Sequence, residues 1–175
     1  GVIKKEFLIS VSEYINKNYE ELDVTFHYSL FHQYSKNKKF SYEQFLEFIR
    51  NNNSKRNNEI LLVSGSNKKK NFDILSVLGD LKDEKNLNIK LGIAYNPYLE
   101  KHFLIPTERE RYEKKISSGL VNSVWLQYGT DIKLLEHEFN YLKKFNIHRN
   151  IKYYGSLLIP SKQFLARFKF RPWKE

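Results

Sequence analysis

Four residues that can bind a polar ligand lie at the ends of short segments with the composition of β-strands. They are His27, Gly65, Asn96 and Gln127. Imidazole and carboxamide groups both donate and accept hydrogen bonds. If the segments are parallel strands, all four residues lie on one rim of the sheet, where β/α barrels bind their ligands. The sequence therefore predicts a ligand-binding rim at the carboxyl ends of its strands.

Each of these residues also has a purely structural interpretation. His27 can be a hydrogen-bonded residue of a strand, and Lys115 can be a solvated charge that the helix dipole favours near a helix end. Gln127 closes an apolar segment, and a buried carboxamide is costly without a hydrogen-bond partner, so we expect it to have one. In the structural interpretation, Ser66 is an ordinary loop residue.

Several kinds of chemistry are excluded by composition and spacing. The chain has no cysteine, which excludes disulfides, thiol catalysis and cysteine zinc sites. The remaining histidines show no metal-binding spacing, and no Ser/His/Asp arrangement stands out; they are His32, His102, His137 and His148. No apolar run approaches the roughly 18 residues that span a membrane, and no secretory signal opens the chain. We therefore expect a protein of the cytoplasm or of an organellar matrix.

The formal net charge of +10 favours anionic partners. Lysines gather in the loops after the first two predicted strands, and such loops suit phosphates, polyglutamate tails or an RNA backbone; they are Lys36, Lys38, Lys39, Lys68, Lys69 and Lys70. The alternative is a compositional bias, because an AT-rich genome overuses Lys, Asn, Ile, Phe and Tyr together.

Five segments have strand composition, and helical patterns alternate with them. Two helix starts are predicted from capping boxes, Thr107 with Glu110 and Ser41 with Gln44, and Gly119 is expected to end the helix that Thr107 opens. Thr130 or Asp131 is the expected cap of a later helix. The predicted strands are residues 23–30, 60–63, 89–95, 123–126 and 151–159, and the predicted helices lie within 1–22, from 41, within 72–84, over 107–118, from 131 and from 161.

Strict alternation of strands and helices predicts an α/β fold with a parallel sheet. An open doubly wound sheet and part of an eight-stranded (β/α) TIM-type barrel both fit this pattern. No glycine-rich dinucleotide fingerprint follows any strand, which favours the barrel. We therefore predict one domain over residues 1–175, a partial barrel of about five parallel strands.

The motifs that end these strands resemble those of the methylenetetrahydrofolate reductase family, over roughly residues 20–165. His27-Tyr28-Ser29 resembles the family's His-Leu-Thr, and Gln127 resembles the Gln of its Thr-Gln-Phe-Phe-Phe-Asp. The other similar segments are Leu62 to Ser66, Gly92 to Pro97, Lys115 to Gly119 and Gly155 to Pro160. The order of these segments along the chain also matches.

The resemblance implies a flavin-bearing barrel that transfers hydride through FAD, from a nicotinamide donor to a folate one-carbon unit. The cofactor performs such chemistry while the protein orients it. Gln127 would bind the pterin of the folate, and Lys115 would face a phosphate. By the same resemblance the flavin site would comprise His27, Ser29, Gly65, Ser66, Tyr95, Asn96 and Lys115.

The sequence departs from the family pattern in four places, one of which is the aromatic run after Gln127, where Tyr128-Gly129-Thr130 stands instead. Ser66 replaces the Asp that tunes the flavin, Ser64 replaces an Arg, and the first strand with its acidic residue has no counterpart before Gly1. The alternative function is therefore a non-catalytic scaffold subunit of a larger, ribonucleoprotein-like assembly. A partial barrel exposes strand edges, so we expect further chain, a second copy or an assembly to complete it. A stable monomer in dilute solution would contradict that expectation.

Overall fold

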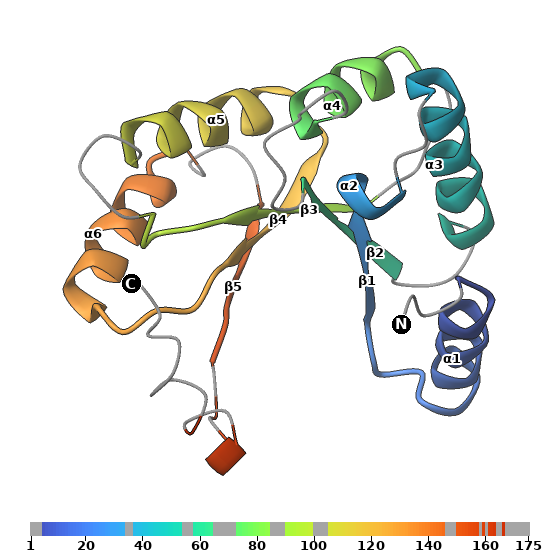
Figure 1. Ribbon diagram of the computed structural model, residues 1–175, viewed down its shortest axis with the longest axis horizontal. Helices are drawn as coiled ribbons and strands as arrows, with labels where there is room; N and C mark the ends of the chain where they lie inside the picture. The colour runs from blue at the N-terminus through green and yellow to red at the C-terminus, as the bar shows by residue number, and fades with distance from the viewer. Residues whose placement is uncertain are drawn as a thin grey trace. The chain divides into compact units, whose positions relative to one another are not determined.

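The computed structural model is an α/β protein whose helices alternate with five strands (Figure 1). It describes residues 5–33, 37–53, 58–64, 73–84, 90–99, 105–145, 150–157, 159, 161–163 and 166. The strands are β1 (Val24–Ser29), β2 (Asn58–Val63), β3 (Leu91–Tyr95), β4 (Val121–Leu126) and β5 (Lys152–Gly155). The helices are α1 (Lys5–Asn18), α2 (Leu30–Gln33), α3 (Lys38–Asn53), α4 (Ile74–Lys82), α5 (Ile105–Ser117) and α6 (Ile132–Lys143).

The five strands form one parallel sheet in the order β1-β2-β3-β4-β5. Each strand is therefore the neighbour of the next strand in the sequence. A doubly wound sheet reverses its direction of growth at a switch point, whereas a β/α barrel adds its strands in sequence order. The prediction of a parallel α/β sheet is confirmed, and barrel closure remains a prediction.

The chain divides into two compact units, Gly1–Gly92 and Ile93–Glu175. The boundary falls inside β3, so this strand begins in the first unit and ends in the second. The assignment of residues 1–175 to one domain remains a prediction. None of the helices within the described residues is long and apolar enough to cross a membrane.

In the first unit, α3 covers one face of the β1–β2 pair with aromatic side chains. The Tyr28 ring lies 4.8 Å from that of Phe45, and Phe26 lies 5.6 Å from Phe48 in an edge-to-face arrangement. Strand residues alternate between faces, which places Thr25, His27 and Ser29 on the opposite side of β1. These ring contacts form the part of the core that lies between β1 and α3.

The start of α3 differs from its prediction. The helix begins at Lys38, and Asn37 caps it by accepting a hydrogen bond from the Phe40 amide at 3.2 Å. Ser41 lies one turn inside the helix, where its hydroxyl donates to the Asn37 carbonyl at 2.9 Å. The capping box of Ser41 and Gln44 is therefore wrong, because an asparagine four residues earlier satisfies the helix start.

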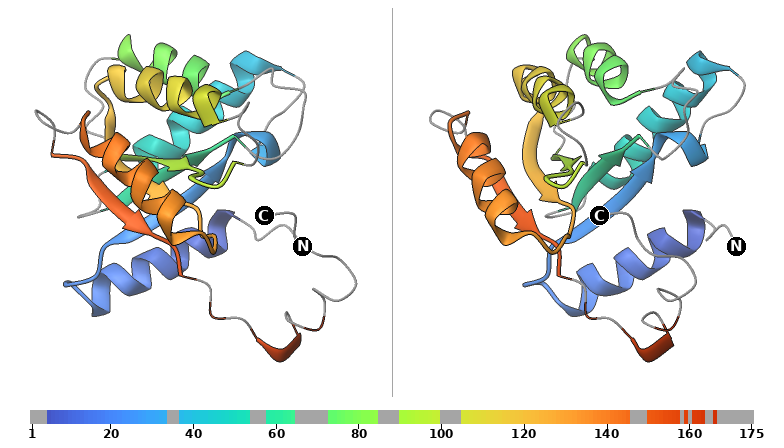
Figure 2. Two further views of the ribbon diagram at one scale, coloured as in Figure 1. Left: turned by 90° about the vertical axis from the view of Figure 1, so that its left-hand side faces the viewer. Right: turned by 60° about the vertical axis from the view of Figure 1, so that its left-hand side comes forward.

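In the second unit, α5 and α6 pack on the same side of β4 and β5 (Figure 2). The Tyr153 hydroxyl of β5 lies 3.1 Å from the Tyr112 hydroxyl of α5 and donates to the Leu142 carbonyl of α6 at 3.1 Å. Tyr112 and Leu142 are fully buried. These contacts join both helices to the last strand.

Two predicted helix boundaries in this unit are confirmed and one is wrong. Asp131 caps α6 by accepting a hydrogen bond from the Leu134 amide at 2.9 Å, and Gly119 ends the α5 segment with a φ of 80°. The Thr107 capping box is wrong, because α5 already begins at Ile105. Its Pro106 suits the first turn of a helix, where no amide donor is needed.

The last strand is shorter than predicted. It ends at Gly155 rather than continuing to residue 159, and residues 156, 157 and 159 have no strand structure. Leu157 and Ile159 are 87% and 83% exposed. Their apolar side chains favoured the prediction of a strand, but the described residues do not bury them.

We predict that the protein loses stability at alkaline pH because the buried hydroxyl of Tyr28 deprotonates. Burial raises the pKa of the Tyr28 hydroxyl from 10.0 to about 12. The folded protein thus holds this proton more tightly than the unfolded chain, and its contribution to stability is lost as pH rises from 10 to 12. In urea unfolding, Tyr28→Phe should flatten that decline. Replacement of the exposed Tyr19 by Phe is the control, and an equal effect of the two would contradict the prediction.

Candidate ligand-binding site at the strand ends

The second unit brings three of the predicted site residues together at the ends of β3 and β4. The Gln127 amide donates to the Tyr95 carbonyl at 2.9 Å, which places the residue after β4 beside the last residue of β3. Asn96 follows directly, and its side-chain oxygen accepts a hydrogen bond from the Tyr98 amide at 2.9 Å. That bond closes a tight turn of the kind that asparagine favours. Tyr95, Asn96 and Gln127 are therefore neighbours.

Gln127 is exposed, whereas the sequence predicted it at a buried strand end. Only its backbone is engaged in the contact with Tyr95. The desolvation argument for an internal hydrogen-bond partner therefore does not hold, because the carboxamide remains in contact with solvent. An exposed carboxamide is suited to a ligand.

An aromatic pair lies on the face of the sheet opposite α5 and α6. Trp125 of β4 stacks on Tyr154 of β5, with ring centroids 4.4 Å apart and planes inclined by 28°. The Trp125 indole donates to the Ser123 hydroxyl at 3.0 Å. Both rings are partly exposed, and the alternation of side chains places Gln127 on the same side as Trp125. The unit thus presents a stacked aromatic pair and a carboxamide on one face of the sheet.

The loop after β4 is held in place by a close contact with Tyr98. A Cβ atom added at Gly129 would lie 2.4 Å from a Tyr98 ring carbon, closer than two carbon atoms can approach. Tyr98 is 7% exposed and cannot swing into free solvent without losing that burial. The conformation of the loop that follows Gln127 therefore requires glycine at position 129.

We predict that Gly129→Ala destabilises the protein by about 1–3 kcal/mol, the usual cost of overpacking. Tyr98→Ala removes the ring that causes the collision. In a double-mutant cycle, the cost of Gly129→Ala should therefore shrink when Tyr98 is also alanine. Additive costs in urea unfolding would show that the contact does not determine the loop.

Lys115 does not face outward from the sheet. It is 3% exposed, and its amine donates to the Ala94 carbonyl of β3 at 3.3 Å and lies 4.0 Å from the Glu108 carboxylate. The resemblance implied that this amine faces a phosphate. The structure instead directs it to the backbone of β3 and to a carboxylate of its own helix.

Tyr95 is also directed into the protein. Its hydroxyl donates to the Glu138 carboxylate of α6 at 2.5 Å, and the same carboxylate accepts bonds from Arg109 Nε at 3.1 Å and Nη2 at 2.6 Å. His137 Nδ1 lies 3.2 Å from Glu138 Oε1. Glu138 is 1% exposed, so this buried carboxylate is surrounded by donors from β3 and α5.

The charge states in this network follow from its hydrogen bonds. Burial by itself raises the pKa of the Glu138 carboxyl, but the hydrogen bonds from Arg109 and Tyr95 outweigh it and hold that pKa below its ordinary value. Burial, together with the bond to Glu138, raises the pKa of Tyr95. The network is therefore an ionised carboxylate beside a neutral phenol and a guanidinium.

Glu138 is not among the residues predicted from the sequence, although the sequence carries a signal for it. Glu138 lies four residues after Leu134 and four before Leu142, within the apolar stripe of α6. An acidic residue in such a stripe indicates a buried charge that must have a partner. Arg109 could not be assigned as that partner, because it is 29 residues away in the sequence.

The first unit holds two of the remaining predicted residues. His27 lies inside β1 with its side chain exposed, on the face away from α3. Ser29 ends the strand, and its hydroxyl oxygen is buried without a hydrogen-bond partner among the described residues. Thr25 on the same face donates to Glu59 at 3.4 Å. The other predicted residues of this rim lie outside the described residues; they are Gly65, Ser66, Lys36 and Lys68 to Lys70.

Within the described ranges, no group of three or more acidic or histidine side chains is arranged to hold a metal ion. In the second unit, the stacked rings of Trp125 and Tyr154 lie on the same face of the sheet as the exposed side chain of Gln127. No protein-family model matches the chain, and no curated protein matches it.

Proposed function

We propose that the chain is a flavin- and folate-binding domain of the methylenetetrahydrofolate reductase kind. Its reaction would be hydride transfer through FAD to a folate one-carbon unit. The observation that supports this best is the stacked pair of Trp125 and Tyr154, which shares a sheet face with the exposed carboxamide of Gln127. The sequential order of the parallel strands also fits a barrel-type fold.

A pterin suits this surface on physical grounds. Its fused rings are flat, and an indole face stacks well on a planar heteroaromatic ring. Its edge carries amide-like donors and acceptors, to which a glutamine carboxamide can bond with both of its polar atoms. The proposal assigns the stacking contact to Trp125 and the edge contact to Gln127. Asn96, adjacent to Gln127, would restrict the position of the pterin ring on Trp125.

The flavin part of the proposal rests on fewer residues than the family resemblance implies. The polar side-chain atoms of Tyr95 and Lys115 are engaged inside the protein by Glu138 and the Ala94 carbonyl. We therefore assign neither of them to the cofactor. His27 and Ser29 have side chains on the face away from α3, and they remain the proposed contributors of the first unit. FAD would supply the redox chemistry, and these residues would bind and orient it.

The second candidate is a non-catalytic scaffold subunit. A stripe of apolar side chains on α1 is exposed, with Phe7 at 59% and Tyr14 at 62%, beside Leu8 and Val11 at 38% each. Spacing at i, i+4 and i+7 is typical of a helix that docks on a partner. The net charge of +10 would favour an RNA-containing partner.

Ligand binding separates the two candidates. The full chain should bind added FAD with a change in flavin absorbance and should bind folic acid with a measurable heat. Gln127→Ala should weaken folic acid binding about tenfold, since one or two hydrogen bonds are lost. Gln163→Ala changes an exposed glutamine after the last strand and should leave binding unchanged. A protein that binds neither ligand but retards RNA in a gel would support the scaffold instead.

A further inference from the structure

Tyr95 joins the strand-end site to the interior of the second unit, because its two polar groups bond to different elements. Its main-chain carbonyl accepts the Gln127 amide at 2.9 Å, and its hydroxyl donates to the Glu138 carboxylate of α6 at 2.5 Å. Its ring is 1% exposed and packs edge to face against Tyr112 of α5, with centroids 5.5 Å apart. A side chain that is packed along its ring and bonded at its tip is held in one orientation, which fixes the end of β3.

The segment that carries Gln127 is held at both ends by this arrangement. Residues 127–131 connect β4 to α6, and Asp131 at their far end is the N-cap of α6. Glu138 lies within the same helix and reaches back to β3 through the Tyr95 hydroxyl. Gln127, α6 and Tyr95 thus form a closed ring of covalent and hydrogen bonds, in which the Glu138 contact joins α6 to the end of β3.

Arg109 of α5 fixes the Glu138 carboxylate in turn. Its Nε and Nη2 atoms donate to the two carboxylate oxygens at 3.1 and 2.6 Å, a bidentate geometry that orients both groups. The guanidinium also lies over the Tyr141 ring, 4.2 Å from its centroid. Lys115 of α5 donates to the carbonyl of Ala94, the residue before Tyr95, at 3.3 Å. Side chains of both helices therefore hold the end of β3.

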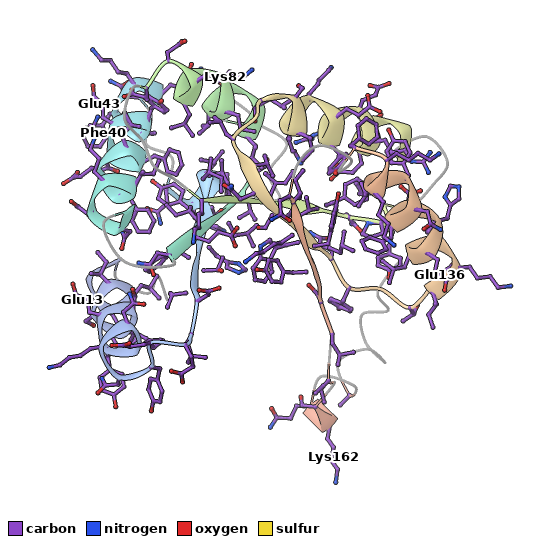
Figure 3. All side chains as sticks on the ribbon, turned by 180° about the vertical axis from the view of Figure 1, so that it is seen from behind. Glu13, Phe40, Glu43, Lys82, Glu136 and Lys162 are labelled. Carbon is purple, nitrogen blue, oxygen red and sulfur yellow. The ribbon has the colours of Figure 1, made fainter. Side chains whose placement is uncertain are left out.

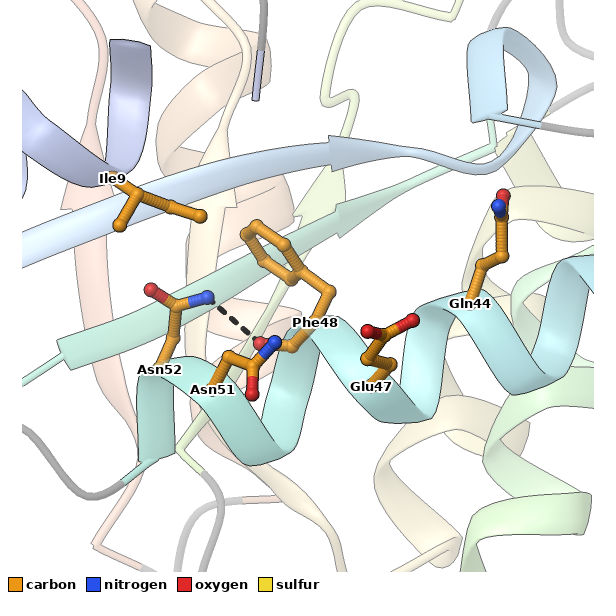
Figure 4. A pocket seen from close by; sticks show the side chains of 6 residues that line it. All are labelled: Ile9, Gln44, Glu47, Phe48, Asn51 and Asn52. Atoms are coloured by element: carbon orange, nitrogen blue, oxygen red, sulfur yellow. Dashed lines mark hydrogen bonds between the residues drawn. The ribbon is translucent and has the colours of Figure 1, made fainter. Parts of the chain in front are cut away.

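Buried polar side chains of the protein do not all join separate elements. In the first unit, the side-chain amide of Asn52 donates to the Phe48 carbonyl of the same helix at 2.7 Å, beside a hollow between α1 and α3 (Figure 4). A bond within one helix positions no strand end. The contacts of Glu138 instead span 43 residues to Tyr95 and 29 residues to Arg109, so they couple elements that the sequence keeps apart.

We propose that Glu138 is a positioning residue of the strand-end site, which acts through Tyr95 to set the place of Gln127. A group that binds a ligand must be held within about 0.5 Å of its productive position by such supporting contacts. The consequence for ligand binding rests on the proposed function, whereas the link from Glu138 to Gln127 is a property of the protein without ligand. If Glu138 only stabilised the fold, Gln127 would not respond to the loss of its bond to Tyr95.

The test is Tyr95→Phe, which removes the hydroxyl and keeps both the buried ring and the pair of Arg109 and Glu138. The backbone and side-chain amide signals of Gln127 should shift in NMR spectra of the full chain. Hydrogen exchange of its backbone amide should accelerate about two- to tenfold, the effect of losing one hydrogen bond. Folic acid binding should weaken by a smaller factor than in Gln127→Ala.

Tyr153→Phe is the matched control, because it removes another hydroxyl that is bonded inside the same unit. That hydroxyl contacts the Leu142 carbonyl and the Tyr112 hydroxyl. Its loss should leave the Gln127 signals, amide exchange and folic acid affinity unchanged. Arg109→Lys keeps a positive charge beside Glu138 and gives up the bidentate contact, so it should shift the Gln127 signals in the same direction as Tyr95→Phe.

The inference is overturned if Tyr95→Phe leaves the Gln127 amides or the affinity for folic acid unchanged, or if Tyr153→Phe alters them as much. In either case the proposed function stands as long as the unchanged protein binds folic acid. A protein that binds no folic acid contradicts the proposed function, and the Gln127 amides then decide by themselves whether Glu138 acts on Gln127.

Discussion

Glu138→Ala is expected to lower the free energy of unfolding by about 3–5 kcal/mol, the range found when one partner of a buried ion pair is removed. The substitution leaves the Arg109 guanidinium and the Tyr95 hydroxyl without their shared acceptor. It also leaves a cavity between α6 and β3. Chemical unfolding in urea measures the effect.

The matched control for this prediction is Glu136→Ala, on the same helix. Figure 3 shows Glu136 on the outer side of α6, and its side chain is exposed. Its replacement should change stability by no more than about 0.5 kcal/mol. Equal effects of the two substitutions would show that the buried carboxylate of Glu138 contributes no more to the free energy of unfolding than the exposed carboxylate of Glu136.

The same residue predicts a dependence of stability on acid. Because the pKa of Glu138 is lower in the folded protein than its ordinary value of 4.5, the folded state binds this proton less tightly than the unfolded chain. The resulting stabilisation is present above pH 4.5 and is lost as pH falls through the folded pKa. Glu138→Ala should therefore lose less stability on acidification than the unchanged protein.

Phe45→Ala is the second substitution with a large expected effect, about 3–5 kcal/mol. Phe45 is fully buried, and its ring lies 4.8 Å from that of Tyr28, so truncation removes one of the ring contacts between α3 and β1. The free energy of unfolding is again the measurement.

Phe40→Ala, on the same helix, is the control for Phe45. Phe40 is 48% exposed and points outward in Figure 3. Its truncation should cost less than about 0.5 kcal/mol, since little apolar surface returns to water. A loss comparable to that of Phe45→Ala would mean that α3 buries a different face.

The strands and the order of elements were predictable because their signals are local. Composition and periodicity indicated each of the five strands, and Asp131 and Gly119 are correct because a cap depends on the residues next to it. The start of α3 was predicted wrongly for a related reason. Ser41 and Asn37 both have side chains that can cap a helix. Their preferences for the N-cap position are similar, so the sequence pattern does not decide which of them caps α3.

The candidate site was predictable only in part. Gln127 was expected beside the other strand ends, and its backbone contact with Tyr95 follows from parallel pairing. The orientation of Lys115 was not predictable, because it depends on the Ala94 carbonyl and on Glu108, which the fold brings to it. The stacking of Trp125 on Tyr154 depends in the same way on the register of β4 with β5.

The most direct measurement of the proposed function is the fluorescence of Trp125 during a titration with folic acid. The chain has one other tryptophan, Trp173, and Trp173→Phe makes Trp125 the sole source of tryptophan emission. A pterin stacked on the indole should quench the emission in a saturable manner, and Gln127→Ala should move the midpoint to higher folic acid concentration. Emission that stays constant up to the solubility limit of folic acid would contradict a pterin site on this face of the sheet.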